Sequence, residues 1–247
     1  MAHTNRFRMT TRILAVLGFG AGCLLLAADE PKQQVQVSKT ERIDFPPGGT
    51  LRLTKSTGVL TVEAWDRPDV EITTIKSTKA EYDAGGRERA KHELNKVRVA
   101  AERHGDELVV TTDFPRHRAI SRFDLEYHIK APSTARIIAS HDVGDVNIDG
   151  LVGDIQVTLL QGEIMLHLPE DGEYNINAKS QFGNVNSDFP GPEKRRWWLL
   201  GHRSVNENSQ AAHKLTLRVG FGDIVILKTR VPAPPGPLTP APKAGGL

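Results

Sequence analysis

The chain has 247 residues, a length that allows one large all-β domain or two smaller domains. Its 38% hydrophobic and 25% charged residues are typical of a globular protein, and its single cysteine excludes a disulfide framework or a thiolate metal site within the chain. Residues 1–28 contain three arginines and no acidic residue, which leaves 29 basic and 30 acidic residues in the remainder. Because nucleic-acid binding requires a basic surface, this balance argues against a nucleic-acid partner.

Residues 1–28 are predicted to be an export signal. The arginines precede an apolar run of 16 residues, Ile13–Ala28, that ends at Asp29. A positive start, an apolar stretch and small residues before a polar segment are typical of a secretory signal, and a bilayer span needs about 20 residues. Cleavage is predicted after Ala28; an uncleaved signal anchor and lipidation of Cys23, in a lipobox-like Gly20–Cys23, are the alternatives. We therefore expect an exported protein of the periplasm or cell surface, free or tethered to the membrane.

The middle of the chain is predicted to consist of short strands. Residues 29–45 are interpreted as an N-terminal linker and residues 46–228 as a β-repeat domain. In the latter, apolar and polar residues alternate between turns rich in Gly, Pro and Asp, as at Leu51 and Leu53 or Leu60 and Val62. Helical spacing of apolar residues occurs only near 86–97, where we expect one short helix or a loop.

A repeat begins at Gly144, in which a glycine and an acid or amide precede two aliphatic residues separated by one position. Glycine permits a positive φ at a corner, and Asp or Asn bonds to the turn backbone, so these residues are assigned a structural turn role. The first spacings are 9, 9, 10 and 11 residues. Such regularity predicts an all-β fold, namely a right-handed β-solenoid or β-helix-like stack, with an antiparallel β-sandwich as the alternative. The turn pairs are Gly144 and Asp145, Gly153 and Asp154, Gly162 and Glu163, Gly183 and Asn184, and Gly222 and Asp223.

These motifs resemble a known family. The repeat, together with Ser180–Val185, Gly220–Ile224 and the earlier Gly58–Asp66, is similar to the putative adhesin family of bacterial envelope proteins, also catalogued as a domain of unknown function. The resemblance covers about residues 50–228, and Pro190–Ala212 departs from it as an insertion. It implies an exported β-solenoid-like domain and brings no catalytic residues with it.

Catalytic and metal-binding motifs are not evident in the sequence. Ser140, His141 and Asp142 have the residue types of a catalytic triad, but neighbours on a strand alternate faces and cannot form a relay. The histidines lack the paired spacing of zinc hydrolases, and the glycine-acid repeat lacks the oxygen ligands that calcium needs. We therefore expect no metal and no cofactor.

Two further segments stand out. Arg195, Arg196, Trp197 and Trp198 form a predicted contact with a partner or a membrane, because exposed Arg and Trp are common interface anchors. The alternative is that one tryptophan covers the end of the core. Six prolines between Pro232 and Pro242 predict that residues 229–247 form a Pro-rich disordered tail.

Taken together, the sequence predicts an exported, non-catalytic envelope protein with an adhesin-like binding or scaffolding role. The expected partner is an envelope protein or glycan, and the oligomeric state is left open. One alternative is a carbohydrate-active β-helix enzyme, which requires carboxylates about 5–9.5 Å apart among Asp142, Asp145, Asp154 and Glu163. Another is a membrane-tethered sensor.

Overall fold

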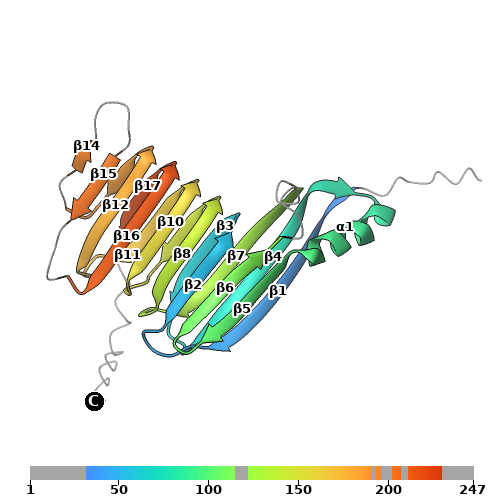
Figure 1. The fold of residues 1–247 in the computed structure, drawn as a ribbon, viewed down its shortest axis with the longest axis horizontal. Coiled ribbons are helices and arrows are strands. Elements are labelled where there is room, and N and C mark those ends of the chain that lie inside the picture. Colours follow the sequence, from blue (N-terminus) through green and yellow to red (C-terminus); the bar gives the residue numbers. More distant parts are fainter. Residues whose placement is uncertain (1–31, 115–121, 191–192, 196–201, 207–210, 230–247) are drawn as a thin grey trace, which may run out of the picture. The chain divides into compact units, whose positions relative to one another are not determined.

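The computed structural model describes residues 32–114, 122–190, 193–195, 202–206 and 211–229, which belong to the unit Lys32–Leu247. These residues form seventeen strands and one helix (Figure 1). The elements are β1 (Gln33–Asp44), β2 (Thr50–Ser56), β3 (Val59–Trp65), β4 (Asp69–Tyr82), α1 (Ala84–Lys96), β5 (Arg98–His104), β6 (Glu107–Asp113), β7 (Phe123–Pro132), β8 (Arg136–Val143), β9 (Val146–Asp149), β10 (Ile155–Gln161), β11 (Ile164–Pro169), β12 (Tyr174–Phe182), β13 (Val185–Ser187), β14 (Glu193–Arg195), β15 (His202–Asn206), β16 (His213–Phe221) and β17 (Ile224–Thr229).

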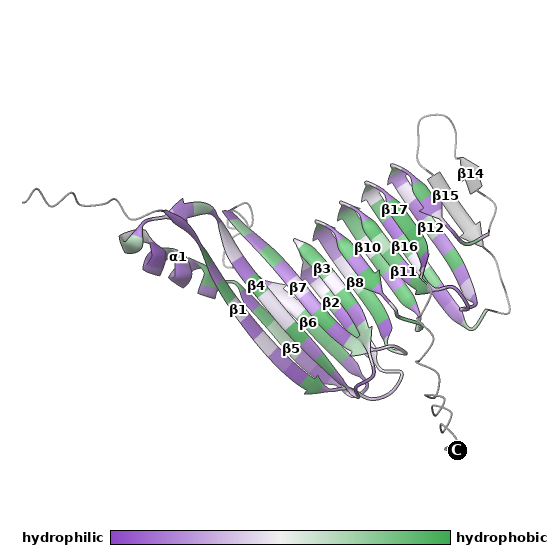
Figure 2. Cartoon of the chain, turned by 180° about the vertical axis from the view of Figure 1, so that it is seen from behind, coloured by the Kyte–Doolittle hydropathy of each residue, from purple (hydrophilic) through white to green (hydrophobic). Residues whose placement is uncertain are grey.

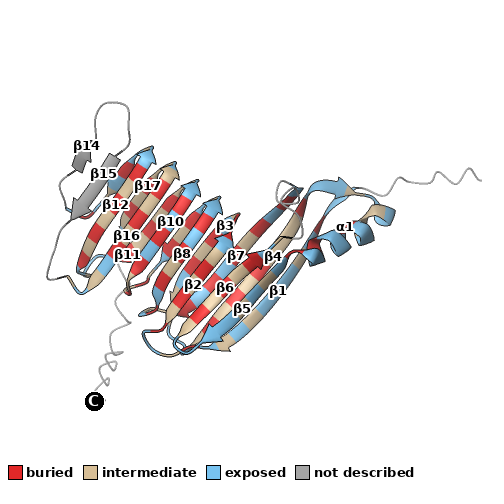
Figure 3. Cartoon of the chain, viewed as in Figure 1, coloured by how far each residue is buried: buried red, intermediate tan, exposed pale blue. Residues whose placement is uncertain are grey.

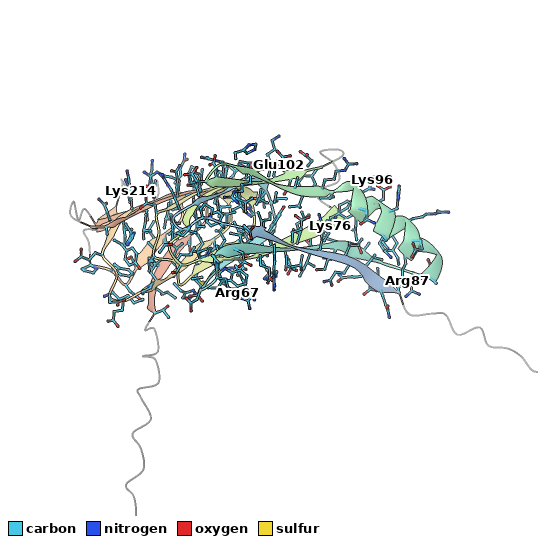
Figure 4. The ribbon with its side chains drawn as sticks, turned by 90° about the horizontal axis from the view of Figure 1, so that it is seen from below. Arg67, Lys76, Arg87, Lys96, Glu102 and Lys214 are labelled. Carbon is cyan, nitrogen blue, oxygen red and sulfur yellow. The ribbon has the colours of Figure 1, made fainter. Side chains whose placement is uncertain are left out.

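The strands form two sheets that lie in two layers (Figure 4). Sheet A has eight strands in the order β1-β4-β7-β3-β9-β11-β17-β13. Sheet B has nine strands in the order β14-β15-β12-β16-β10-β8-β2-β6-β5. Buried side chains of both sheets form one hydrophobic core, and buried and exposed residues alternate along the strands, as do hydrophobic and hydrophilic ones (Figures 2 and 3). This alternation is the period-2 pattern expected of strands with one face in a core.

The all-β prediction is confirmed, but the right-handed solenoid is not supported. Both sheets are mixed. In the spatial order given above, neighbouring strands are parallel from β7 to β13 in sheet A and from β12 to β6 in sheet B. The strands outside these stretches pair antiparallel with their neighbours. The strand order is also not sequential, because β16 lies between β10 and β12 and β17 lies between β11 and β13. The alternative of an antiparallel sandwich fails for the same central strands. Short glycine turns could not reveal this order, because they connect the two sheets rather than neighbours within one sheet.

The nine-residue repeat is half of a larger structural unit. Gly144 connects β8 in sheet B to β9 in sheet A, and the chain returns to sheet B through a turn that contains Gly153. Gly162 then connects β10 to β11, in the same way as Gly144. Alternate repeats therefore lie at opposite rims of the two sheets, and the full unit is a pair of strands, one in each sheet.

The predicted helix is present as α1. The Asp83 side chain accepts a hydrogen bond of 2.7 Å from the Gly86 amide and so caps the first turn. Ala90 and Leu94 are buried, as the helical spacing indicates.

Strand β1 lies in the segment that the sequence assigns to a linker, residues 29–45. It pairs antiparallel with β4 from Gln33 to Asp44, so this part of the chain is an edge strand of sheet A and not a linker. Its apolar residues are few because an edge strand covers little core, and this explains why its alternation is weak. The predicted signal at residues 1–28 and the tail from residue 230 onward lie outside the described residues.

Candidate functional site: an apolar strip beside the glycine corners

Five glycine corners lie in a row along one rim of the two sheets. At each, a sheet B strand ends and a sheet A strand begins, and each glycine has a positive φ, between 101° and 149°. In spatial order they are Gly58, Gly144, Gly162, Gly222 and Gly183. We call this edge the glycine rim.

Backbone hydrogen bonds connect neighbouring corners across the whole rim. The amide of Gly144 donates to the Gln161 carbonyl (2.9 Å), and that of Gly162 donates to the Phe221 carbonyl (3.0 Å). The corners approach so closely that a Cβ on Gly162 would lie 1.9 Å from the Gly144 carbonyl oxygen. Only glycine fits at such a contact, so the rim is a rigid, closely packed edge.

Two aspartates of the repeat accept hydrogen bonds from backbone amides of neighbouring corners. Asp145 Oδ1 accepts from the Glu163 amide (3.2 Å), and Asp223 Oδ1 accepts from the Asn184 amide (2.7 Å). Asp154 lies at the opposite rim, where its Oδ1 accepts from the Lys214 amide (2.9 Å). Gly153, beside it, has no positive φ but lacks space for a side chain, since a Cβ would lie 2.2 Å from the Ala135 carbonyl oxygen.

This arrangement does not bring the four candidate carboxylates together. Asp154 lies at the rim opposite to Asp145 and Glu163, whereas Asp142 lies near the end of β8, two residues before Gly144, on the side of the glycine rim. Within the described ranges, no group of three or more His, Cys, Asp or Glu side chains could hold a metal ion. The four carboxylates therefore do not converge on one point, because Asp154 lies at the other rim.

A row of exposed apolar side chains, which the sequence did not lead us to predict, runs along the same rim. Every large hydrophobic side chain that is exposed in the described residues lies within two positions of a corner glycine. We call this row the corner strip, and it consists of Val59, Val143, Leu160, Phe221 and Phe182.

Strand register places Val143, Phe221 and Phe182 in one row across sheet B, with the polar Gln161 between Val143 and Phe221. Val143 pairs with Gln161, Gln161 with Phe221, and Phe221 with Phe182. The rings of Phe182 and Phe221 are stacked, with centroids 4.8 Å apart and an interplanar angle of 8°, yet the residues are 40% and 53% exposed. Val143, Phe182 and Phe221, each just before a corner glycine, have the inward parity of their strands, but they lie beyond the end of the core and so reach solvent. The apolar residues that adjoin the glycines are the signal by which this row could have been found in the sequence.

Beneath the strip, a buried histidine joins two corners. The Nε2 of His141 lies 2.9 Å from the Gly58 carbonyl oxygen, and its Nδ1 lies 2.8 Å from Ser56 Oγ. Because a carbonyl can only accept, Nε2 carries a proton, and Ser56 Oγ lies between Nδ1 and the Ser140 carbonyl oxygen, which is 3.3 Å away. Both residues are 2% exposed, and burial lowers the pKa of His141.

This pair confirms that Ser140, His141 and Asp142 form no relay. The hydroxyl that His141 contacts belongs to Ser56, 85 residues away in sequence. Its Nε2–H is bonded to a backbone carbonyl, and the site is closed to solvent, so the pair has a structural role.

The predicted contact at Arg195–Trp198 is not located by the structure. Arg196, Trp197 and Trp198 lie outside the described residues, and Arg195 is described only as the last backbone position of β14. No helix in the described part of the chain is both long and apolar enough to cross a membrane.

Comparisons with known proteins find distant structural likenesses. No family model and no curated protein matches the chain. A putative cell adhesion protein from Clostridium sporogenes is 15% identical, with a TM-score of 0.49, over 78% of this chain and all of that one. A putative adhesin from Parabacteroides merdae is 11% identical, with a TM-score of 0.21, over 61% of this chain and 68% of that one. A putative adhesin from Bacteroides fragilis is 10% identical, with a TM-score of 0.27, over 77% of this chain and 97% of that one. Likenesses this distant do not transfer a function to the chain.

Proposed function

We propose that the chain is an exported, non-catalytic binding protein of the bacterial cell envelope, adhesin-like in role, and that the corner strip is its binding surface. The observation that carries this proposal is the confinement of exposed large apolar side chains to one rim. Exposed apolar residues that are scattered singly are normal on a protein surface, whereas several of them gathered at one rim are typical of an interaction site.

The backbone beneath the strip supports this role. Corner amides and carbonyls are bonded to neighbouring corners, so the strip is held in place before any partner arrives. A preorganised surface loses little conformational entropy on binding. The acids that border it already bond to backbone amides and are suited to holding the corners rather than to proton transfer.

The chemistry of the strip favours a protein partner over a glycan. Three aliphatic and two aromatic side chains offer an apolar contact, whereas a glycan needs converging hydrogen-bond groups for its hydroxyls. The stacked Phe182 and Phe221 are the expected anchors, because aromatic side chains carry most of the energy at interfaces of this kind.

The test is binding of the labelled protein to isolated cell envelopes of the producing organism. We expect saturable binding that protease treatment of the envelopes abolishes. The double variant Phe182→Ser/Phe221→Ser should weaken it about 30-fold, the effect of losing about 2 kcal/mol at a hot spot.

Two control variants make this test specific. Gln156→Ser changes an exposed residue of β10 outside the strip and should bind as the wild type does. Phe182→Leu/Phe221→Leu keeps the strip apolar and should retain most of the affinity. The proposal is wrong if binding is absent or if the serine variant binds normally, and binding that survives protease would indicate a glycan instead.

A further inference from the structure

A second candidate site lies between the two sheets at the end formed by β1 and β5. A cavity of about 310 Å³ is bounded there by β1 and β4 of sheet A, by β5 of sheet B and by the end of α1. This volume is at the lower limit of the 300–1,000 Å³ typical of small-molecule sites. Its lining includes the apolar residues Ile72, Val97, Val99 and Ala101.

Strand register directs charged side chains into this cavity. On β4, Val70, Ile72 and Thr74 are buried on the inner face, and Lys76 follows at the next inward position. Lys39 pairs with Thr74 on the adjacent β1, so it shares that inner face. Figure 4 shows Lys76 between the two layers.

Lys39, Lys76 and Arg98 line the cavity together with one acid, Glu41, and so leave it with excess positive charge. Lys39 forms an ion pair with Glu41, which also lines the cavity. Among the residues that the structure describes, no carboxylate lies within ion-pair distance of Lys76. Its Nζ donates a hydrogen bond to the Val97 carbonyl at 3.0 Å. Burial, and then the charge of Lys39, lower the pKa of Lys76. An anion placed between the two ammonium groups would relieve this repulsion.

Structural roles explain part of this arrangement. The bond to Val97 places a cation at the last turn of α1 and uses one of the three Lys76 protons. Inward charges on an edge strand protect a sheet from aggregation, which accounts for Lys39 and Glu41 on β1. Lys76 is on β4, which is paired on both sides, so edge protection does not require it there.

We propose that this cavity binds a single-chain fatty acid, with Lys76 and Lys39 holding the carboxylate and the apolar lining contacting the hydrocarbon chain. The volume of about 310 Å³ suits one hydrocarbon chain better than two, and one pair of ammonium groups suits a carboxylate. The cavity lies at the β1 and β5 end of the sheets, whereas Phe182 and Phe221 lie on β12 and β16 toward the other end. This inference is therefore independent of the corner strip.

The test is titration of the purified chain with dodecanoate, below the concentration at which dodecanoate aggregates, followed by calorimetry. We expect saturable binding with one ligand per chain. Lys76→Met should weaken binding at least tenfold, whereas Lys79→Met should not change it. Lys79 is an exposed residue of the same strand whose ion pair with Asp124 (3.4 Å) is also exposed.

Lys76→Met also removes the hydrogen bond to the Val97 carbonyl at the end of α1, and this loss could prevent folding. A second set of measurements therefore tests the proposal without that variant. Ala101→Phe leaves both lysines in place, fills the cavity and should abolish binding, while Lys76→Arg should retain it. Dodecanol should bind at least tenfold more weakly than dodecanoate. Absence of saturable binding, or equal binding by wild type and Ala101→Phe, would overturn the proposal; equal binding of dodecanol would overturn the role of the lysines.

Discussion

At the scale of single residues, the buried histidine couples folding to pH. The Nε2–H of His141 donates to the Gly58 carbonyl and its Nδ1 contacts Ser56 Oγ, in a site that is closed to solvent. Burial, the largest cause, lowers the pKa of His141 from its usual 6.5. The unfolded chain therefore binds a proton at this residue at a higher pH than the folded chain does.

The sign of the pH effect follows from this difference. Above about pH 6.5 the histidine is neutral in both states, and its contribution to stability is fully present. As the pH falls through 6.5 toward the lower folded pKa, the unfolded state gains a proton and the folded state does not. The free energy of unfolding should fall by up to about 1.4 kcal/mol per pH unit from this group.

Urea unfolding of the wild type and His141→Gln between pH 5 and pH 8 measures this contribution. The variant will be less stable at pH 8, and its stability should depend less steeply on pH below 6.5. Parallel pH profiles for the two proteins would contradict the assignment. His104, an exposed residue of β5, provides the matched control as His104→Gln.

At the scale of elements, the corners depend on glycine for two separable reasons. Gly162 has a φ of +138°, which side chains rarely adopt, and a Cβ there would meet the Gly144 carbonyl oxygen. Gly105, in the turn between β5 and β6, has a φ of +66°, but a Cβ there would have nothing within 4 Å. The first position therefore carries backbone strain and a steric clash, and the second only the strain.

Gly162→Ala should lower the free energy of unfolding by about 3 kcal/mol or more, because the neighbouring corner must also move. Gly105→Ala should cost about 1–2 kcal/mol, the usual penalty for a left-handed residue with a Cβ. Chemical denaturation of both variants gives the comparison. Equal losses would mean that the close approach of the corners is not what requires glycine.

At the scale of the whole molecule, the last two strands lie between earlier strands in both sheets. β16 pairs with β10 and β12, and β17 pairs with β11 and β13. Leu215, Leu217, Ile224 and Ile226 of these strands are fully buried. The strands that come earlier in the chain therefore lack their neighbours until the C-terminal strands join the sheets.

A chain that ends at Gln210 should lose its cooperative unfolding transition, because four strands lose a partner and part of the core. A chain that ends at Thr229 lacks only the Pro-rich segment and should keep the free energy of unfolding within about 0.5 kcal/mol. Circular dichroism during urea titration distinguishes the two. A cooperative transition in the shorter chain would show that β16 and β17 are dispensable, and a large loss in the longer one would place residues 230–247 in the fold.

The local features of this protein could be predicted from its sequence alone. Alternation marked the strands, helical spacing marked α1, and the glycine-acid pairs marked tight turns, because each depends on φ preferences and on which side chains share a face. The partner of Asp145 could not be predicted in this way, because its carboxylate accepts from the Glu163 amide at the next corner and not from its own turn. Strand β1 was missed because its edge position leaves few apolar residues to signal it.

The arrangement of these elements became visible only in the tertiary structure. The equal spacing of the turns does not indicate at which rim each turn lies or which strands pair with each other. The position of β16 and β17 between earlier strands could therefore not be predicted. The same holds for the partner of His141, for the corner strip and for the cavity at Lys76. Each brings together residues from separate strands, and such contacts are fixed by sheet order and register, which depend on the packing of the whole core.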